Sequence, residues 1–435
     1  MSIVPVKKPI KSTIKDKDEV LQQQVSDILK TVQNKGDSGL YYYCEKFDKF
    51  TDKNLKLSEK QIRSAYDSLD DGIYESIKQA AKNIEQFAQI QRESIVPKVI
   101  EIAPGITLGH NILPISSSAS YVPGGRYPLP SSALMSIIPA RVAGVNRIVA
   151  CSPPDSSIGT INPATVVAMD VAGANEIYCM GGAHAIGALA YGTESIAPVD
   201  IIVGPGNQWV TEAKRQVSGF VGIDFLAGPS EVLIIADNTA NPQFIAADLL
   251  AQSEHDPQAR GILIATDRGL IEDTIRYLEE FLQKLSTEPI ARKAWNENGM
   301  IYLVDHLSEA VELSNKIAPE HLELHISNPD TIIPELNNYG SLFIGSWCAE
   351  VFGDYISGTN HILPTMRASR YTGGVWVGTF LKVVSYQSIT KEGAQELAPI
   401  ASKLAELEGL YAHKLAADIR IKKLTQHERK TCRQL

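Results

Sequence analysis

The sequence has few cysteines, and none of them follow the spacings at which cysteines usually act together. Its 435 residues contain Cys44, Cys151, Cys179, Cys348 and Cys432, which are scattered without a C-x-x-C pair. This distribution argues against a disulfide framework and against a zinc site built from thiolates. The cysteines therefore indicate a protein from a reducing compartment.

Membrane, secreted and nucleic-acid-binding proteins have sequence features that this chain lacks. No uninterrupted apolar stretch approaches the roughly 20 residues that span a bilayer. The segment MSIVPVKKPIKSTIKDKDEV has neither the apolar core nor the cleavage site of a secretory signal. The net charge is -9, and no run of lysine and arginine is interleaved with aromatic residues. We therefore expect a soluble, cytoplasmic protein that binds neither membranes nor nucleic acids.

The order of apolar segments predicts an α/β fold in more than one domain. A capping box of Ser58 and Gln61 opens a long predicted helix over 58–91. From about 116, short β-branched runs alternate with predicted helices at 131–144, 163–174, 184–191, 208–217 and 242–254. Such alternation is typical of βαβ units and parallel sheets. The tail from about 386 is helical and too small to bury an apolar stripe alone, so it should pack on the body or on a second subunit.

Several predicted strands end in glycine, where open α/β sheets usually bind ligands. The loops contain Gly124-Gly125, Gly181-Gly182 and the segment Gly204-Pro205-Gly206-Asn207. Because ligands bind at the carboxyl ends of parallel strands, these loops suit a phosphate-bearing cofactor. The dinucleotide fingerprint is incomplete, since Trp209 stands where its third glycine belongs. A cofactor loop and a tight turn without a ligand both remain open for this segment.

Two short stretches suggest chemistry but also have ordinary structural interpretations. In LLAQSEHDP, Gln252 and His255 would share one face of the last turn of a helix. They are either a polar helix end that faces water or half of a metal site. In APEHLEL, Glu320 adjoins His321 after a proline, which suits either acid–base catalysis or the first turn of a helix.

Two further segments contain residues that a metal could recruit. GDYISGTNHILPT contains Asp354 and His361, and LEGLYAHK places Glu408 and His413 in the predicted tail helix. Gln252, His255, Asp354 and His413 would offer an amide, a carboxylate and two imidazoles, a set that zinc accepts. Spacing alone does not show that the four meet. The histidines interpreted as structural or surface groups are His110, His306, His325 and His427.

Seven motifs occur in the order and spacing of one enzyme family. They are YVPGG, GPGN, AGPSE, QSEH, PEHL, GDYISGTNH and EGLYAHK, and together they extend through nearly the whole chain. In these segments the sequence resembles histidinol dehydrogenase. The resemblance implies an α/β fold of two incomplete Rossmann-like domains with parallel sheets, plus a small N-terminal extension and a helical C-terminal extension. The implied domains are 1–21, 22–119 with 231–375, 120–230 and 376–435.

The resemblance also assigns roles to individual residues. It implies one Zn²⁺ per subunit, held by Gln252, His255, Asp354 and His413, and a catalytic pair formed by Glu320 and His321. The implied NAD contacts are Tyr121, His184 and Asn207. The implied substrate contacts are Ser230, Gln252, His255, His321, Asp354, His361, Glu408 and His413. Members of this family are homodimers with shared active sites. The resemblance therefore implies that His413 and Glu408 enter each active site from the partner subunit.

The implied activity is the oxidation of L-histidinol to L-histidine through histidinaldehyde, with two NAD⁺, at the end of histidine biosynthesis. Two departures from the family pattern bear on this expectation. His184 stands where the family usually carries a glutamine. The segment MRASRYTGGVWVG looks closer to relatives that oxidise other polar alcohols, including sulfonated propanediols. Arg367 or Arg370 could pair with an anionic substrate there or lie at the surface.

Two other classes of protein could contain some of these motifs. One is a zinc hydrolase in which Glu320 activates water without a nicotinamide. The glycine-ended strands between 121 and 207 argue against it. The other is a non-catalytic protein that binds a metal or a nucleotide. Glu320 and His321 argue against that, because binding alone requires neither.

Overall fold

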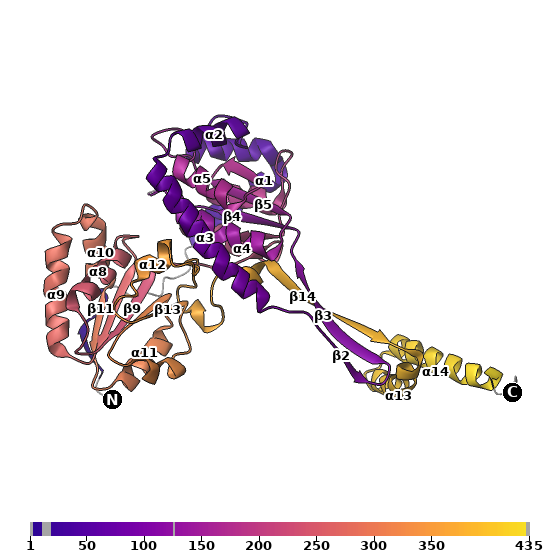
Figure 1. The fold of residues 1–435 in the computed structure, drawn as a ribbon. Helices are drawn as coiled ribbons and strands as arrows, with labels where there is room; N and C mark the ends of the chain where they lie inside the picture. Colours follow the sequence, from indigo (N-terminus) through magenta and orange to yellow (C-terminus); the bar gives the residue numbers. More distant parts are fainter. Residues whose placement is uncertain (1–2, 11–18, 125–126, 432–435) are drawn as a thin grey trace. The chain divides into compact units, whose positions relative to one another are not determined.

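The chain divides into two compact units in the computed structural model (Figure 1). The model describes residues 3–10, 19–124 and 127–431, with side chains up to residue 422. The first unit comprises Met1–Arg92 and Ile115–Phe380, and the second comprises Glu93–Pro114 and Leu381–Leu435. Gly125, Cys432 and the side chain of His427 lie outside the described residues.

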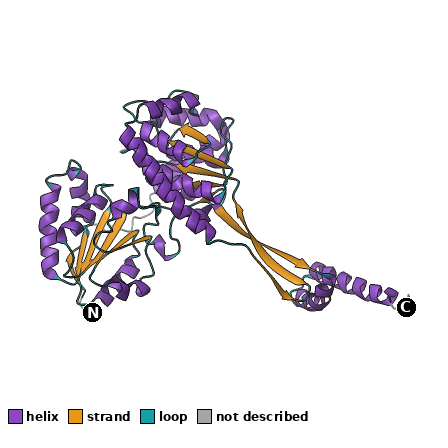
Figure 2. Ribbon diagram, viewed as in Figure 1, coloured by secondary structure: helices purple, strands orange, loops and turns teal. Residues whose placement is uncertain are grey.

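The larger sheet of the first unit is mainly parallel and has helices on both faces (Figure 2). Within the described residues its order is β1-β11-β10-β9-β12-β13, and β1 alone pairs antiparallel. Its strands are β1 (Val4–Lys7), β9 (Glu231–Ala236), β10 (Arg260–Ala265), β11 (Met300–Leu303), β12 (His321–His325) and β13 (Ser341–Ile344). One face packs on α8 (Pro242–Ser253), α9 (Arg268–Leu282) and α10 (Glu288–Asn298), and the other on α11 (Leu307–Ile317).

The second sheet of this unit is parallel in all its described pairs. Its order is β6-β5-β4-β7-β8. The strands are β4 (Ser117–Tyr121), β5 (Arg147–Ser152), β6 (Glu176–Cys179), β7 (Ile201–Val203) and β8 (Gly222–Ile223). The helices that follow these strands are α4 (Pro130–Ala143), α5 (Pro163–Ala172), α6 (Gly182–Tyr191) and α7 (Gln208–Val217).

Both sheets follow the strand order of an incomplete Rossmann fold. Numbered along the chain, the parallel strands β11-β10-β9-β12-β13 run 3-2-1-4-5, and so do β6-β5-β4-β7-β8. The complete doubly wound order is 3-2-1-4-5-6, so each half lacks its last strand. This topology confirms the expected fold class. The GPGN segment follows β7, the fourth strand of its sheet, and not the first strand, where the complete glycine fingerprint belongs.

The N-terminal helices pack with the five-stranded sheet. α1 (Glu19–Tyr43) shares a buried core with β4, β5, α6 and α7. The capping box of Ser58 and Gln61 is confirmed, but the predicted long helix is two helices, α2 (Glu59–Asp67) and α3 (Asp71–Glu93). This packing differs from the expected grouping of 22–119 with 231–375, and the domain boundaries otherwise stay a prediction.

The second unit combines a ribbon of strands with the two tail helices. β14 (Leu381–Ile389) pairs antiparallel with β3 (Ile106–Pro114), which pairs with β2 (Lys98–Ala103). The segment 98–114 therefore belongs with the tail and not with the body, a pairing that the sequence pattern did not predict. α13 (Lys391–Leu407) and α14 (Tyr411–Thr431) pack on each other.

Short helical segments complete the described chain. They are η1 (Cys44–Asp48), η2 (Pro329–Thr331), η3 (Ile333–Glu335), α12 (Glu350–Tyr355), η4 (Ala368–Arg370) and η5 (Val377–Phe380). Of the helices within the described ranges, none is both long enough and apolar enough to cross a membrane.

Candidate active site

The end of α8 buries its glutamine. The helix begins at Pro242 behind the capping side chain of Asn241 and ends at Ser253. Gln252 in its last turn is 0% exposed, whereas His255 is exposed in the turn that follows. The interpretation as a polar helix end facing water is therefore wrong for Gln252. His255 lies in the turn that follows α8 and not in its last helical turn, where the sequence pattern predicted it.

Glu320 and His321 lie at the start of a central strand. β12 begins at His321, so the alternative interpretation of this pair as the first turn of a helix is wrong. β12 is parallel to β9 in the register His321–Val232, which puts the pair at the amino-terminal edge of the six-stranded sheet. Both side chains are buried.

The imidazole of His321 is held so that one nitrogen remains available. Its Nδ1 donates a hydrogen bond to the carbonyl oxygen of Glu231 (3.1 Å), and Nε2 is buried without a hydrogen-bond partner. Nε2 lies 3.7 Å from Asp354 Oδ1. Burial lowers the pKa of His321 below its usual value, so the ring is neutral near pH 7. A neutral ring with a fixed Nδ1–H presents a basic Nε2.

Glu320 is buried in a way that favours its protonated form. Its Oε2 accepts a hydrogen bond from the Glu231 N–H (2.8 Å). Burial raises the pKa of Glu320 well above its usual range, and the nearby carboxylates of Glu231 and Asp354 raise it further. A carboxylate whose pKa is raised binds a proton more strongly than an ordinary carboxylate, which suits a general base.

α12 brings two carboxylates to this edge of the sheet. Glu350 and Asp354 are four residues apart and therefore on one face of the helix. Glu350 Oε1 lies 3.4 Å from His321 Nδ1, and its Oε2 is buried without a hydrogen-bond partner. Candidate ligand atoms of His255, Glu350 and Asp354 all lie within 4.8 Å of one another. Glu350 is a site residue that sequence reasoning missed, although its spacing from Asp354 in EVFGDY was visible.

The amide of Gln252 tests whether a cation fits here. With its nitrogen toward Glu350 Oε1 (2.5 Å), its oxygen accepts from the Glu231 N–H (2.7 Å). Rotated by half a turn, the amide oxygen would face that carboxylate oxygen, and a shared cation would stabilise such an arrangement. Amide, imidazole and carboxylate groups from α8, the following turn and α12 therefore suit a zinc ion. The residues of this unit fit the expected metal.

The remaining expected substrate contacts of the first unit differ in how they are held. His361 has both ring nitrogens engaged, Nδ1 with the Asp354 carbonyl (2.8 Å) and Nε2 with Ser132 Oγ (3.3 Å). Burial lowers the pKa of His361. Ser230 directly precedes β9, beside the Glu231 peptide. Arg367 and Arg370 are both exposed, which agrees with the interpretation of surface arginines.

The expected NAD residues of β4 and α6 meet at one loop. The Tyr121 hydroxyl accepts from the Gly182 N–H (3.1 Å) at the start of α6. His184 is 1% exposed, and its Nε2 is paired with Asp48 Oδ2 (3.0 Å). Asp48 Oδ2 also accepts from the Gly181 N–H (3.0 Å), so this residue of η1 fixes the loop, although sequence reasoning missed it.

The third expected NAD residue, Asn207, begins α7. Its side chain accepts from the N–H groups of Trp209 (3.0 Å) and Val210 (3.2 Å), so it caps the helix. The preceding glycine loop rests on a buried ion pair between Lys214 and Asp224. Lys214 Nζ donates to the Gly204 carbonyl (2.9 Å), and Asp224 accepts from the Gly204 N–H (2.8 Å).

The tail residues lie in the second unit, on either side of a turn. Glu408 caps the C-terminus of α13, and His413 is in α14. Gly409 between them has a φ of 73°, which ends the first helix. The sequence pattern predicted both residues in one tail helix, whereas the structure separates them by a turn between two helices. Both side chains are exposed.

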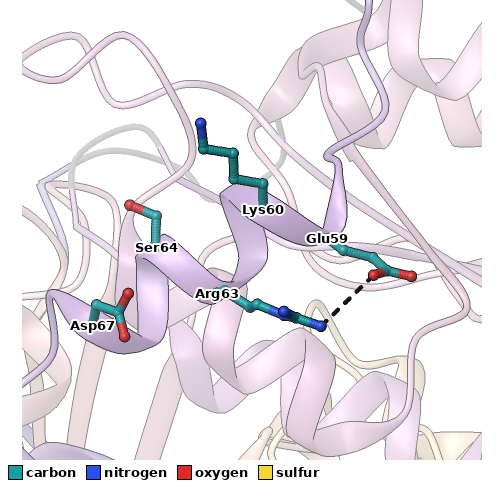
Figure 3. A pocket seen from close by; sticks show the side chains of 5 residues that line it. All are labelled: Glu59, Lys60, Arg63, Ser64 and Asp67. Carbon is teal, nitrogen blue, oxygen red and sulfur yellow. Dashed lines mark ion pairs between the residues drawn. The ribbon is translucent and has the colours of Figure 1, made fainter.

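A hollow on α2 is unrelated to these groups (Figure 3). Figure 3 shows the side chains that line it, which are Glu59, Lys60, Arg63, Ser64 and Asp67. Glu59 and Arg63 form an exposed ion pair (3.9 Å), of a kind that contributes little to binding or stability. Every lining residue comes from one exposed helix, so we do not assign it a function.

The fold and the site together define an α/β protein with a buried Glu–His pair beside a candidate metal site. The model of the family described as histidinol dehydrogenase matches residues 11–421, and the chain therefore belongs to the histidinol dehydrogenase family. A histidinol dehydrogenase of Methanothermobacter thermautotrophicus is 46% identical, over 92% of each chain. A histidinol dehydrogenase homolog of Shouchella clausii is 45% identical, over 95% of this chain and 97% of that protein.

A crystal structure shares this architecture. The histidinol dehydrogenase of Elizabethkingia anophelis is 40% identical, and the two structures align with a TM-score of 0.90. The alignment covers 96% of this chain and 95% of that one. The likeness extends through both units.

Proposed function

We propose that this protein oxidises L-histidinol to L-histidine through histidinaldehyde, with Zn²⁺ and two NAD⁺, as a cytoplasmic enzyme of histidine biosynthesis. The observation that carries the proposal is the buried imidazole of His321 with one fixed and one available nitrogen. Its Nδ1–H is fixed to the Glu231 carbonyl, and its Nε2 has no hydrogen-bond partner and lies 3.7 Å from Asp354. A base held in this way beside a candidate metal ligand suits the removal of a proton from an alcohol.

In this proposal one zinc per subunit is held by Gln252, His255 and Asp354, with His413 of the partner subunit as the fourth ligand. When bound, zinc would supply a Lewis acid that holds the substrate, and NAD⁺ would supply the electron acceptor. Ser230, His361 and the partner subunit's Glu408 would complete the substrate contacts. Glu350, which lies beside Gln252, would add negative charge around the metal.

The two side chains of the catalytic pair then have separate roles. His321 Nε2 takes the hydroxyl proton as the alcohol becomes an aldehyde. Glu320, whose pKa is raised by burial, takes a proton from the water that attacks the aldehyde. His321 takes the hydroxyl proton of the resulting hydrate in the second oxidation. Burial of both groups keeps other water away from the aldehyde.

NAD would bind at the glycine loops of the five-stranded sheet. Tyr121 and Asn207 would contact it, together with the backbone around Gly181 and Gly204. His184 is turned toward Asp48, so in this proposal it shapes the loop and offers only its unpartnered Nδ1 to the cofactor. The carboxyl edge of a Rossmann-like sheet is the usual place for such a cofactor.

The exposed apolar surface of the second unit supports a homodimer. Large apolar side chains on both tail helices and on the ribbon are exposed, among them Leu404, Leu407, Tyr411, Leu415, Val383 and Val99. Leu407 is 83% exposed. Many large apolar side chains exposed on so small a unit favour an interface. A partner subunit that covers it would bring its own Glu408 and His413 to the shared active site.

The first experiment counts NADH formed per molecule of L-histidinol at limiting substrate. We expect about two NADH, because an alcohol becomes an acid in two oxidations. A strong chelator should abolish turnover, and added zinc should restore it. One NADH per substrate, or turnover that survives complete metal removal, would contradict the proposal.

The shared site is tested by mixing variant subunits. Hybrids of His413→Ala with Glu320→Ala should recover about a quarter of wild-type activity, because half of the dimers then contain one complete site. The matched control mixes Glu320→Ala with His321→Asn, which should recover nothing because both changes are in the same half-site. Equal recovery in the two mixtures, or none in either despite proven exchange, would argue against tails that reach the partner.

A second candidate is the oxidation of another polar alcohol, such as a sulfonated propanediol, at the same site. The relative from Shouchella clausii is named a homolog and is as similar to this chain as the histidinol dehydrogenases are. The segment after LPT also has an unusual backbone, with Met366 and Arg367 at positive φ. NADH formation with the sulfonated alcohol but not with histidinol would favour this candidate.

A further inference from the structure

β12 presents two chemically different faces. Leu322 and Leu324 point into the apolar core on the α11 side of the sheet. His321, Glu323 and His325 alternate with them and therefore face α8. Their neighbours in β9 on that face, Val232 and Ile234 among them, belong to an apolar core. Three ionisable side chains thus occupy positions where an apolar strand would be the ordinary choice.

Glu323 is the centre of this buried polar row. It is 0% exposed, and its Oε2 is paired with His325 Nε2 (3.2 Å). Asp248, one turn before Gln252 in α8, lies 3.9 Å from the same nitrogen. Burial, and then the negative charge of Glu323, raise the pKa of Asp248, which therefore keeps a proton that it can share with Glu323. Both neighbours thus hold the Glu323 carboxylate in one orientation.

The second oxygen of Glu323 reaches α12. Oε1 accepts a hydrogen bond from the backbone N–H of Glu350 (2.9 Å), the first residue of that helix. The side chain of an N-cap residue accepts from the second or third N–H of a helix and not from the first, so no residue at Ala349 could replace this hydrogen bond. A helix of six residues has little stability of its own and depends on such contacts. Glu323 therefore caps the first N–H of α12 from a neighbouring strand.

We propose that Glu323, oriented by His325 and Asp248, is a positioning residue that holds α12 so that Glu350 and Asp354 face Gln252 and His255. It touches neither substrate nor metal in this role. The inference rests on the proposed function, since the residue that it positions, Asp354, is a proposed zinc ligand. A fully buried carboxylate is costly unless it is paired, so a purely structural position would accept an apolar side chain.

The test compares zinc affinity among variants of the full-length protein by competition with a chromophoric chelator. Glu323→Leu removes the cap, and we expect it to weaken zinc binding about 10- to 100-fold, the usual effect of losing a residue that orients a metal ligand. Glu323→Gln keeps an oxygen that can accept from Glu350 and should lose no more than about threefold. Adding Ala349→Ser to Glu323→Leu supplies a cap for the second and third N–H groups of α12 but not for that of Glu350, so it should restore little of the affinity; full recovery would show that α12 needs only a local cap and would argue against a specific role of Glu323.

Leu324→Ala is the matched control, because it disturbs the same strand on its opposite, apolar face. It should lower the melting temperature and leave zinc affinity unchanged. An equal loss of affinity in Leu324→Ala and Glu323→Leu, or no loss in Glu323→Leu, would overturn the positioning role. If Glu323→Leu fails to fold, Glu323→Asp replaces it, because this change retracts the carboxylate by one methylene. We expect Glu323→Asp to lower zinc affinity several-fold. An unchanged zinc affinity would contradict the positioning role.

Amide hydrogen exchange of α12 separates this inference from the proposed function. The Glu350 and Asp354 segment should exchange faster in Glu323→Leu than in the wild type even without zinc, because the cap is lost. If the wild type binds no zinc, the proposed metal site is wrong, and exchange alone then decides the capping role. Unchanged protection of α12 would refute the positioning role whatever the metal does.

Discussion

Replacement of His321 by asparagine is the sharpest test of the proposed chemistry. The asparagine amide can still donate a hydrogen bond toward the Glu231 carbonyl, which now accepts from Nδ1. It has no group at the position of Nε2, so the base is removed while its anchor is kept. The candidate metal ligands Gln252, His255 and Asp354 are untouched, and zinc content should not change.

The expected magnitude follows from what a positioned base contributes. General base catalysis accelerates a step by about 10²- to 10⁴-fold, which corresponds to about 2.7–5.5 kcal/mol of transition-state stabilisation. His321 acts in both oxidations, so neither step can bypass the loss. In the wild type, burial lowers the pKa of His321, and kcat/KM should fall only as the pH drops below the usual histidine range. The His321→Asn variant should lack that acidic limb.

The assay is NADH formation from L-histidinol across pH, together with zinc analysis of the same samples. Turnover of His321→Asn within tenfold of the wild type would remove His321 from the mechanism. A variant that has lost both zinc and activity would show instead that the residue supports the metal site. A retained acidic limb would assign the titration to another group.

Three further results are expected. Glu320→Gln should stop after the first oxidation and release about one NADH per histidinol, and two NADH from this variant would exclude Glu320 as the base. In the wild type, the oxidation of the aldehyde should become faster as the pH rises through the raised pKa of Glu320. Lys214→Met should lower the free energy of unfolding by about 3–5 kcal/mol, because it leaves Asp224 buried and unpaired. Denaturant titration should show that adding Asp224→Asn restores part of this free energy. Zinc at 100 times its Kd should raise the free energy of unfolding by about 2.7 kcal/mol, so removing zinc should lower the melting temperature. An unchanged melting temperature would indicate that the folded protein binds no zinc.

The architecture was largely predictable because it depends on local patterns. Alternating strands and helices led to parallel sheets, and the end of α4 and the bounds of α7 agree closely with prediction. The antiparallel ribbon was not predictable in this way, because β14 pairs with β3 across more than two hundred residues. Periodicity reports which face of a strand is buried but not its distant partner.

The site was predictable in its residue types and less so in its placement. The rule that ligands bind at the carboxyl ends of strands suits Tyr121 and Gly181, but Glu320 and His321 lie at the amino edge of the other sheet. The spacing of Glu350 from Asp354 is typical of one helix face, but such a pair is common on exposed helices and does not by itself indicate a site. The grouping of Gln252, Glu350 and Asp354 depends on tertiary packing, which no local pattern encodes.

The peptide group of Glu231 has a consequence for how this site can change during evolution. Its N–H donates to Glu320, and its carbonyl accepts from His321. No side-chain substitution at 231 can delete these contacts, since every residue except proline supplies the same N–H and carbonyl. An insertion or deletion in the AGPSE segment would move the peptide and disturb both members of the catalytic pair at once. Among homologues that keep the activity, we therefore expect the length of this loop to be more constant than its residue identities.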